Sequence, residues 1–311
     1  MENRILIVDD VHEVLLQKLD AASIHYDYLP QATRSEVEAI IALYTGLVIR
    51  SKFQVDASFI DLAPHLRLIA RCGAGMDNID KSYAYAKNIS LFSANEGNQD
   101  AVGEHMIGML LNLMNNLNQG HQQIKNGLWK REENRGYELK GRTIALIGYG
   151  HNGQAMAKKL SGFDVQVIAY DKYKTGFSDQ YAREVSMEEV VKHADVLSFH
   201  IPLTRETHGL VDEEYLFHFR KPIFFLMGAR GPIADIPSIL KYIKQGKILG
   251  AAFDVLPVEK FPALEQQSWY EELINLPNVL LSPHVAGWTF ESYYKLSAIV
   301  ADKIIGHLKP S

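Results

Sequence analysis

Four ionisable side chains stand directly after strand-like segments in the second half of the chain. Arg230 lies near the end of the run FFLMGARG, Asp254 and Glu259 lie in GAAFDVLPVEK, and His284 ends LLSPH. In an open parallel sheet, ligands bind beyond the carboxyl ends of the strands. We therefore expect these side chains to meet at one edge of a sheet.

Three of these side chains suit one kind of chemistry. Arg230 can hold a carboxylate through paired N–H bonds. His284 can exchange a proton with a hydroxyl group, and Glu259 beside it would fix the ring tautomer and favour the imidazolium. Such a trio matches the interconversion of a 2-hydroxy acid and a 2-oxo acid. Each residue alone is equally typical of a surface arginine, a solvated glutamate or a loop histidine, so the interpretation depends on the elements around them.

A glycine-rich turn supplies the first such element. The stretch TIALIGYGHNGQAMAKKL places Gly148, Gly150 and Gly153 in a GxGxxG pattern between an apolar strand and a helix. Gly148 makes the tight turn, Gly150 lets the backbone approach a pyrophosphate, and Gly153 lets helix and strand pack closely. The helix N-terminus offers N–H groups to the phosphates. The alternative is an ordinary tight turn in a βαβ unit.

Asp171 follows the next strand and completes this pattern. Its carboxylate would accept hydrogen bonds from the adenosine ribose hydroxyls and would repel a 2′-phosphate. The constellation therefore predicts a dinucleotide site that prefers NAD over NADP.

Short β-rich runs alternate with helical patterns along the whole chain, which is typical of βαβ units and parallel sheets. We expect an α/β protein with two doubly wound parallel-sheet domains. The expected strands are 4–10, 24–29, 46–51, 66–73 and 89–95, followed by 143–148, 165–170, 195–202, 222–231, 248–255 and 278–284.

The helical segments show their own signals. Residues 99–120 are predicted to form one long helix that ends at Gly120 and packs on protein through an apolar stripe. The stripe comprises Val102, Met106, Met109, Leu110, Leu113 and Leu117. Ser186 and Glu189 have capping-box spacing in the helix 186–194, and residues 289–308 form another long helix.

Composition excludes several classes of protein. The 311 residues suffice for about two domains. A net charge of −5 without a basic block argues against nucleic-acid binding. No apolar run approaches the length of a membrane span, and MENRILIVDD leaves no room for a secretory signal. The single cysteine, Cys72, excludes an intrachain disulfide, so we expect a cytoplasmic protein.

With these features in view, the chain resembles the D-isomer-specific 2-hydroxyacid dehydrogenases over nearly its full length. The segments that carry the resemblance are GAGMDNID, AVGEHMIGMLL, LKGRTIALIGYGHNG, HIPLTRETHGL, ARG, AAFDVLPVE and SPHVAGWT. The resemblance implies a flavodoxin-like substrate domain, formed by residues 1–98 and the returning segment 288–311, and an inserted NAD-binding Rossmann domain, residues 99–287. It also implies a homodimer that involves the long helix near residue 100.

The family's functional positions transfer residue by residue. The resemblance assigns Arg230, Glu259 and His284 to the catalytic trio, His151 and Asn152 to the pyrophosphate loop, and Asp254 to the vicinity of the nicotinamide amide. Further cofactor positions are Ala74, at the cleft between the domains, and Val102, Gly148, Gly150, Gly153, Asp171, His200, Ile201, Pro202, Gly228, Ala229 and Gly287. No metal site is expected.

Three positions depart from the family pattern. Met227 stands where asparagine is usual, which would loosen the polar scaffold under Arg230. Lys260 replaces a common proline, and Trp288 places a bulky ring next to His284, which would narrow the pocket.

The substrate is a small 2-hydroxy acid, and GLVIRSKF offers a clue to which one. Arg50, Ser51 and Lys52 look like the phosphate-contacting stretch of D-3-phosphoglycerate dehydrogenases, enzymes of serine biosynthesis, and two cations around a hydroxyl suit a phosphomonoester. Gly73, Ala74 and Gly75 complete the expected substrate loop, with Arg230 and His284. The alternative is that the two cations are simply solvated. The chain ends with its helix, so no feedback through a C-terminal regulatory domain is expected.

Two other functions remain open from the sequence. A glyoxylate or hydroxypyruvate reductase would use the same trio without needing Arg50 and Lys52. A corepressor similar to the C-terminal-binding proteins would keep the fold and trio as an NAD-gated docking module, but the chain shows no regulatory tail.

Overall fold

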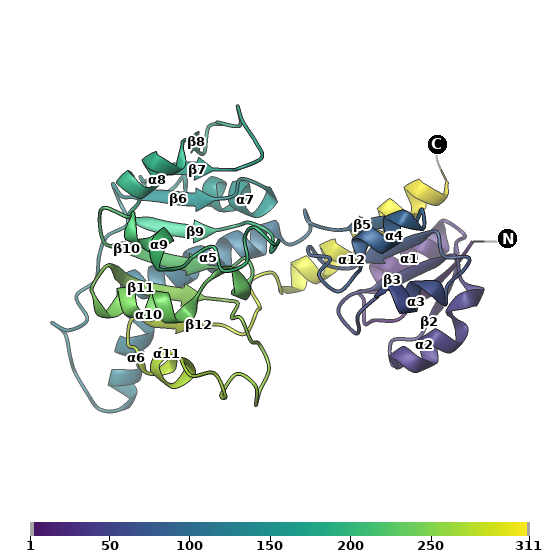
Figure 1. The fold of residues 1–311 in the computed structure, drawn as a ribbon, viewed down its shortest axis with the longest axis horizontal. Coiled ribbons are helices and arrows are strands. Elements are labelled where there is room, and N and C mark those ends of the chain that lie inside the picture. Colours follow the sequence, from purple (N-terminus) through teal and green to yellow (C-terminus); the bar gives the residue numbers. More distant parts are fainter. Residues whose placement is uncertain (1–2, 310–311) are drawn as a thin grey trace. The chain divides into compact units, whose positions relative to one another are not determined.

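The computed structural model describes residues 3–309 and divides the chain into two compact units (Figure 1). The first unit comprises Met1–Asn98 and Trp288–Ser311, and the second comprises Gln99–Gly287. Each is an α/β unit built on a parallel sheet, as the alternation of strands and helices predicts.

The first unit contains a five-stranded parallel sheet in the order β2-β1-β3-β4-β5. This is the flavodoxin-like strand order. Strand β2 lies on one side of β1, and the later strands are added on the other side, from β3 onward. The strands are β1 (Arg4–Ile7), β2 (His25–Tyr28), β3 (Gly46–Ile49), β4 (Leu68–Arg71) and β5 (Ser90–Ser93). Its helices are α1 (Val14–Ala21), α2 (Arg34–Ile40), α3 (Ala57–Asp61), α4 (Lys81–Ala86) and α12 (Phe290–Leu308), with a 3-10 turn at Ile41–Leu43.

Successive side chains of these strands enter two separate cores, one on each face of the sheet. Ile5 and Ile7 pack in the core that also contains Leu296 and Val300 of α12, whereas Leu6 packs in the core on the other face. Figure 1 shows α12, in yellow, among the purple and blue elements of this unit. The last helix therefore belongs to the unit formed by the first hundred residues.

The second unit contains a seven-stranded parallel sheet in the order β12-β11-β10-β9-β6-β7-β8. This is the Rossmann strand order. Strands β7 and β8 lie on one side of β6, and the later strands are added on the other side, from β9 onward. The strands are β6 (Thr143–Ile147), β7 (Gln166–Tyr170), β8 (Arg183–Glu184), β9 (Val196–Phe199), β10 (Ile223–Met227), β11 (Ile248–Phe253) and β12 (Val279–Leu281). The sequence patterns predict all of these except β8, whose two residues are too short to show a period.

Helices cover both faces of this sheet, and two separate hydrophobic cores pack against it. The helices are α5 (Gln99–Met114), α6 (Leu117–Lys125), α7 (His151–Leu160), α8 (Met187–His193), α9 (Glu213–Phe217), α10 (Ile236–Lys244) and α11 (Tyr270–Asn275), with a 3-10 turn at Gly231–Ile233. Within residues 3–309, no helix is long and apolar enough to cross a membrane.

The prediction of one helix over 99–120 is wrong. The helix breaks after Met114, because Asn116 adopts a left-handed conformation with φ 52°, which asparagine tolerates better than most residues. The side chain of Asn115 donates to the Leu111 carbonyl, and that of Asn112 accepts from the Asn118 amide. These side chains therefore compete with continuation of the helix. Gly120 lies inside α6, and Leu117 is 57% exposed rather than packed.

Candidate active site

The glycine loop between β6 and α7 has the geometry that a dinucleotide needs. Gly148 has φ +96°, and a Cβ there would stand 2.7 Å from the carbonyl oxygen of His200. At Gly153 a Cβ would stand 2.3 Å from the Gly148 carbonyl oxygen, so α7 approaches the turn as closely as its backbone allows. No atom lies within 4 Å of the corresponding position at Gly150.

The start of α7 is also open to an anion. Its N-cap, Gly150, carries no side chain that could bind the first N–H groups, which belong to His151 and Asn152. Backbone N–H groups at a helix N-terminus, next to open space, bind phosphate oxygens. The residues of this loop therefore fit the pyrophosphate of NAD.

Asp171 is fixed where the ribose carboxylate of a Rossmann domain is expected. Its Oδ2 accepts from the Tyr149 amide at 3.0 Å, and its Oδ1 accepts from the Tyr173 amide at 3.0 Å. Each carboxylate oxygen keeps lone-pair capacity for a further donor. The carboxylate is thus oriented by the glycine loop and can accept from ribose hydroxyls.

His200, Ile201 and Pro202 follow β9, the strand next to β6. His200 Nε2 lies 3.0 Å from the hydroxyl of Ser198, while its Nδ1 is buried without a hydrogen-bond partner. Enclosure by protein lowers the pKa of His200 to about 4, so the ring is neutral at pH 7. An orphaned polar atom beside the glycine turn is a further sign of a ligand-facing edge.

His284 and Glu259 form the pair that their chemistry predicts. His284 Nδ1 lies 2.9 Å from Glu259 Oε2, and about half of the His284 side chain is exposed. A carboxylate only accepts, so the proton lies on Nδ1 and leaves Nε2 for a substrate. The hydrogen bond that His284 donates to Glu259 raises the pKa of His284, against the opposing effects of desolvation and the nearby Arg230 charge.

Arg230 follows β10 within electrostatic reach of this pair. One of its guanidinium nitrogens, Nη1, donates to the Ala229 carbonyl at 2.7 Å. Two residues earlier in the chain, a Cβ at Gly228 would stand 2.4 Å from Met106 Sδ of α5, so the backbone passes close to that helix. Met227 is fully buried, and its carbonyl accepts from the Asp254 amide at 3.0 Å. The backbone therefore provides scaffolding where the family usually has an asparagine.

Other predicted cofactor positions lie near these groups or in the core. Val102 is buried in the same cluster as Met106 of α5. Asp254 is 2% exposed, and its carboxylate accepts from Ser282 Oγ and from the amides of Val285 and Ala286. These hydrogen bonds connect Asp254 to the residues around His284. Ser282 and His105, which contacts it, lie in the segments SPHVAGWT and AVGEHMIGMLL, but the sequence analysis gave neither residue a role, because nothing in the sequence shows that they meet.

The expected substrate loops lie in the first unit. Arg71 connects them: its Nε donates to the Arg50 carbonyl at 2.7 Å, and its Nη1 donates to the Gly75 carbonyl. Gly73 and Ala74 form the turn before Gly75. Arg71 is a structural residue that the sequence analysis missed, since these two backbone carbonyls leave no pattern in the sequence.

The two cations of the 50–52 loop, Arg50 and Lys52, contact different partners. The Arg50 guanidinium lies 4.6 Å from the centre of the Trp288 ring, and its Nη1 is buried without a hydrogen-bond partner. Lys52 Nζ donates to the carbonyls of Pro30 and Ala32. The amides of Arg50, Ser51 and Lys52 all donate to one oxygen of Asp9, at 2.8, 2.8 and 3.0 Å.

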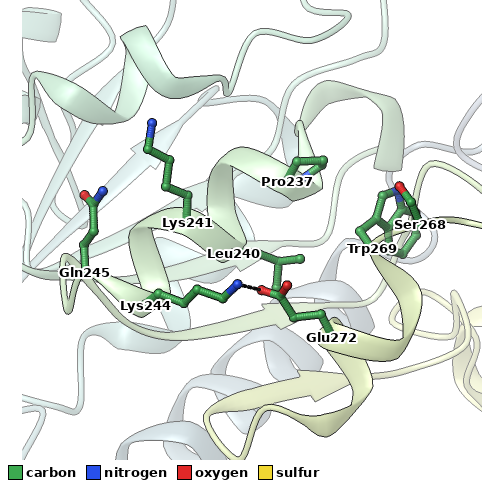
Figure 2. Close-up of a pocket in the computed structure, with 8 residues that line it drawn as sticks. All are labelled: Pro237, Leu240, Lys241, Lys244, Gln245, Ser268, Trp269 and Glu272. Carbon is green, nitrogen blue, oxygen red and sulfur yellow. Dashed lines mark ion pairs between the residues drawn. The ribbon is translucent and has the colours of Figure 1, made fainter.

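The second unit has a hollow beside the predicted catalytic residues and another hollow away from them. One, of about 300 Å³, lies beside His284 and Glu259 and is lined mainly by apolar residues such as Phe261, Leu264 and Ile274. The other, shown in Figure 2, lies beside α10, where Lys244 pairs with Glu272 at 2.7 Å. None of the predicted site residues lines the second hollow. Among residues 3–309, no group of three or more His, Cys, Asp or Glu side chains is arranged to hold a metal ion.

Comparison with known proteins identifies the family of the chain. Residues 107–286 match the model of the D-isomer specific 2-hydroxyacid dehydrogenase, NAD binding domain. The chain is 30% identical over 318 residues to a glyoxylate reductase of Thermococcus litoralis, covering 99% of this chain and 91% of that protein. The chain therefore belongs to the D-isomer specific 2-hydroxyacid dehydrogenase family, and the matched segment is its NAD-binding domain.

A second relative is of a different length. The chain is 30% identical over 308 residues to a D-3-phosphoglycerate dehydrogenase of Archaeoglobus fulgidus, which covers 98% of this chain and 57% of that protein. The chain thus spans little more than half of this relative. Among solved structures, D-lactate dehydrogenase from Aquifex aeolicus, complexed with NAD and lactic acid, has a TM-score of 0.83 at 23% identity. It covers 99% of this chain and 96% of that one, and it shares the fold.

Proposed function

We propose that the protein is an NAD-dependent oxidoreductase that interconverts D-2-hydroxy acids and 2-oxo acids. The observation that carries this proposal is the 2.9 Å pair between His284 Nδ1 and Glu259 Oε2, in the same unit as the glycine loop. Bound NAD(H) supplies the hydride acceptor or donor. The protein needs only to bind and orient this cofactor. The residues that would do so are Gly148, Gly150, Gly153 and Asp171.

The remaining chemistry belongs to the trio. Arg230 binds the substrate carboxylate through its planar fork of N–H donors. His284 Nε2 donates a proton to the carbonyl oxygen of the 2-oxo acid, or removes it from the hydroxyl in the reverse direction. Glu259 holds the ring with Nδ1 protonated and stabilises the imidazolium. A positioned proton transfer of this kind contributes about 10²- to 10⁴-fold to the rate.

A panel of 2-oxo acids with NADH tests this function. We expect turnover of at least one of glyoxylate, hydroxypyruvate, pyruvate and 3-phosphohydroxypyruvate. NADH binding without turnover of any of them would favour an NAD-gated docking module instead.

For the substrate, we propose 3-phosphoglycerate and 3-phosphohydroxypyruvate, with Arg50 as the phosphate contact. The buried, unpartnered Nη1 of Arg50 supports an anionic ligand there. A small-acid reductase acting on glyoxylate or hydroxypyruvate is the second candidate. Two contacts favour it, because they occupy donors that a phosphate would otherwise bind. Asp9 already accepts from the three amides of the loop, and Lys52 donates to backbone carbonyls.

Comparison of Arg50→Ala with the parent separates the two substrates. Loss of one charge-assisted hydrogen bond should lower kcat/KM for 3-phosphohydroxypyruvate about ten- to a hundredfold and leave glyoxylate unchanged. Lys52→Ala is the matched variant, and its carbonyl-bound side chain should matter less. Equal losses on both substrates, or a parent that prefers glyoxylate, would establish the small-acid reductase.

We also propose a homodimer that uses α6 and the segment after it. Four apolar side chains there are exposed: Leu117, Ile124, Leu128 and Trp129, the last to 84%. Such a cluster is typical of a protein contact. Light scattering should show a dimer for the parent and a monomer for Ile124→Glu.

Finally, the one cysteine, Cys72, is buried and free, which supports a reducing, cytoplasmic setting.

A further inference from the structure

The loop that carries His284 is held by one residue, Asp254, at the end of β11. The Asp254 carbonyl oxygen accepts from the His284 amide at 2.8 Å. Its carboxylate oxygens Oδ1 and Oδ2 accept from the amides of Val285 and Ala286, each at 2.9 Å. Three successive N–H groups of the loop therefore bind a single side chain and its own backbone.

This loop needs to be held, because His284 has φ 55°. A left-handed conformation is unfavourable for a non-glycine residue, and it persists where surrounding contacts fix it. The contacts to Asp254 are those that fix it here. Any residue that orients the Asp254 carboxylate therefore also orients the imidazole of His284.

His105 of α5 reaches that carboxylate through Ser282. Ser282 Oγ lies 2.6 Å from Asp254 Oδ1, and His105 Nε2 lies 3.0 Å from Ser282 Oγ. The hydroxyl has one proton, and a carboxylate accepts it in preference to the weaker acceptor Met109 Sδ, 3.7 Å away. The hydroxyl must then accept from His105, so Nε2 of His105 carries a proton. The chain of donors runs from His105 to Ser282 to Asp254.

We propose that His105 is a positioning residue for the reaction, acting through Ser282 and Asp254 on the backbone of His284. This inference rests on the proposed function, since it assumes that His284 transfers the proton. Asp254 is a charged group that is 2% exposed, so each donor it loses weakens its hold on the loop. His105 supplies the donor that commits the Ser282 hydroxyl to Asp254, and it does so from a helix far from His284 in the sequence.

The experiment compares His105→Leu, Ser282→Ala and the double variant. Each single change should lower kcat about ten- to a hundredfold, the usual effect of losing a hydrogen bond to a charged group. The double variant should be little slower than Ser282→Ala, because His105 Nε2 lies 3.6 Å from Asp254 Oδ1, too far for a direct hydrogen bond, and its hydrogen bond goes to that hydroxyl. Titration by NADH fluorescence should give a smaller change in the dissociation constant than in kcat. Losses that multiply in the double variant would overturn the proposal.

Two further variants control for the fold. His105→Gln keeps an N–H donor near the position of Nε2 and should recover most of the turnover. Glu104→Gln alters the preceding residue of α5, whose carboxylate pairs with Lys159 at 2.8 Å, and should leave kcat unchanged. A His105→Gln variant as slow as His105→Leu, at an equal melting temperature, would contradict the positioning role.

The two proposals fail in different ways. If His284→Ala turns over substrate as fast as the parent, the proposed function is wrong. If His284→Ala is slow but His105→Leu is as fast as the parent, the proposed function stands and the role of His105 is wrong.

Discussion

The two units have the same architecture but treat the edge of the sheet differently. In the first unit, the amides of residues 50–52 converge on an oxygen of Asp9, so a carboxylate of the same unit satisfies the donors of this loop. In the second unit, no side chain caps the start of α7, and the space beside Gly150 is open. Two parallel-sheet units can thus present one closed and one open anion site at the carboxyl ends of their strands.

The comparison explains why fold alone does not assign the ligand. A flavodoxin-like sheet and a Rossmann sheet both place loops at the carboxyl ends of their strands. The ligand binds where N–H groups are left without an internal partner. In this protein the glycine loop meets that condition. We therefore expect the two units to respond differently when their donors are altered.

The largest expected effect is that of His284→Ala. Turnover should fall by about 10²-fold or more, because the variant has no group to exchange the proton. The dissociation constant of NADH should stay near that of the parent, as measured by fluorescence titration. A parallel loss of NADH binding would show that His284 supports the fold of the second unit rather than the chemistry.

Crowding the glycine loop should weaken the binding of NADH. In Gly153→Ala the new methyl would meet the Gly148 carbonyl oxygen at 2.3 Å, and overpacking of this kind costs about 1–3 kcal/mol. NADH affinity should fall by about tenfold or more. Gly162→Ala, with no atom within 4 Å, is the matched control. Unchanged NADH affinity in Gly153→Ala would mean that α7 does not need this close approach.

Asp171→Ala tests the choice of dinucleotide. Removal of the carboxylate should weaken NADH by about tenfold, through the loss of charge-assisted hydrogen bonds, and should affect NADPH less. The dissociation constants for NADH and NADPH should therefore be closer to each other in the variant than in the parent. Equal affinity of the intact protein for NADH and NADPH would remove Asp171 from cofactor selection.

Opening the closed site should make the first unit respond to anions. Asp9→Ala leaves the three amides without their acceptor, which should lower the melting temperature by about 5 °C. Inorganic phosphate should then raise the melting temperature of the variant more than that of the parent. Asp80→Ala, which removes a helix cap in the same unit, is the control without a phosphate response. Identical phosphate responses in Asp9→Ala and the parent would refute the comparison between the two edges.

The sequence predicted the elements and the residue types better than the partners. The GxGxxG turn and the strand ends of Arg230, Glu259 and His284 follow from local patterns, because glycine geometry and strand periodicity are encoded over a few residues. The 2.9 Å pair of His284 and Glu259 was also expected from their chemistry.

What the sequence did not reveal depends on contacts between distant segments. Asp9 binds amides more than forty positions away, and His105 meets Ser282 across 177 positions. Neither contact leaves a period or motif. The break at Asn116 arises from side chains competing with the helix backbone, which an apolar stripe does not show.

The pH dependence of 2-oxo acid reduction by Glu259→Gln tests the central claim most directly. The carboxylate of Glu259 raises the pKa of His284, so the parent keeps the imidazolium, and with it the reductive rate, to higher pH. Without that charge the pKa falls. The alkaline decline of kcat/KM should therefore move to lower pH in Glu259→Gln, and the rise of the oxidative rate should move in the same direction. An alkaline decline at the same pH in both proteins would contradict a proton transfer by the His284–Glu259 pair.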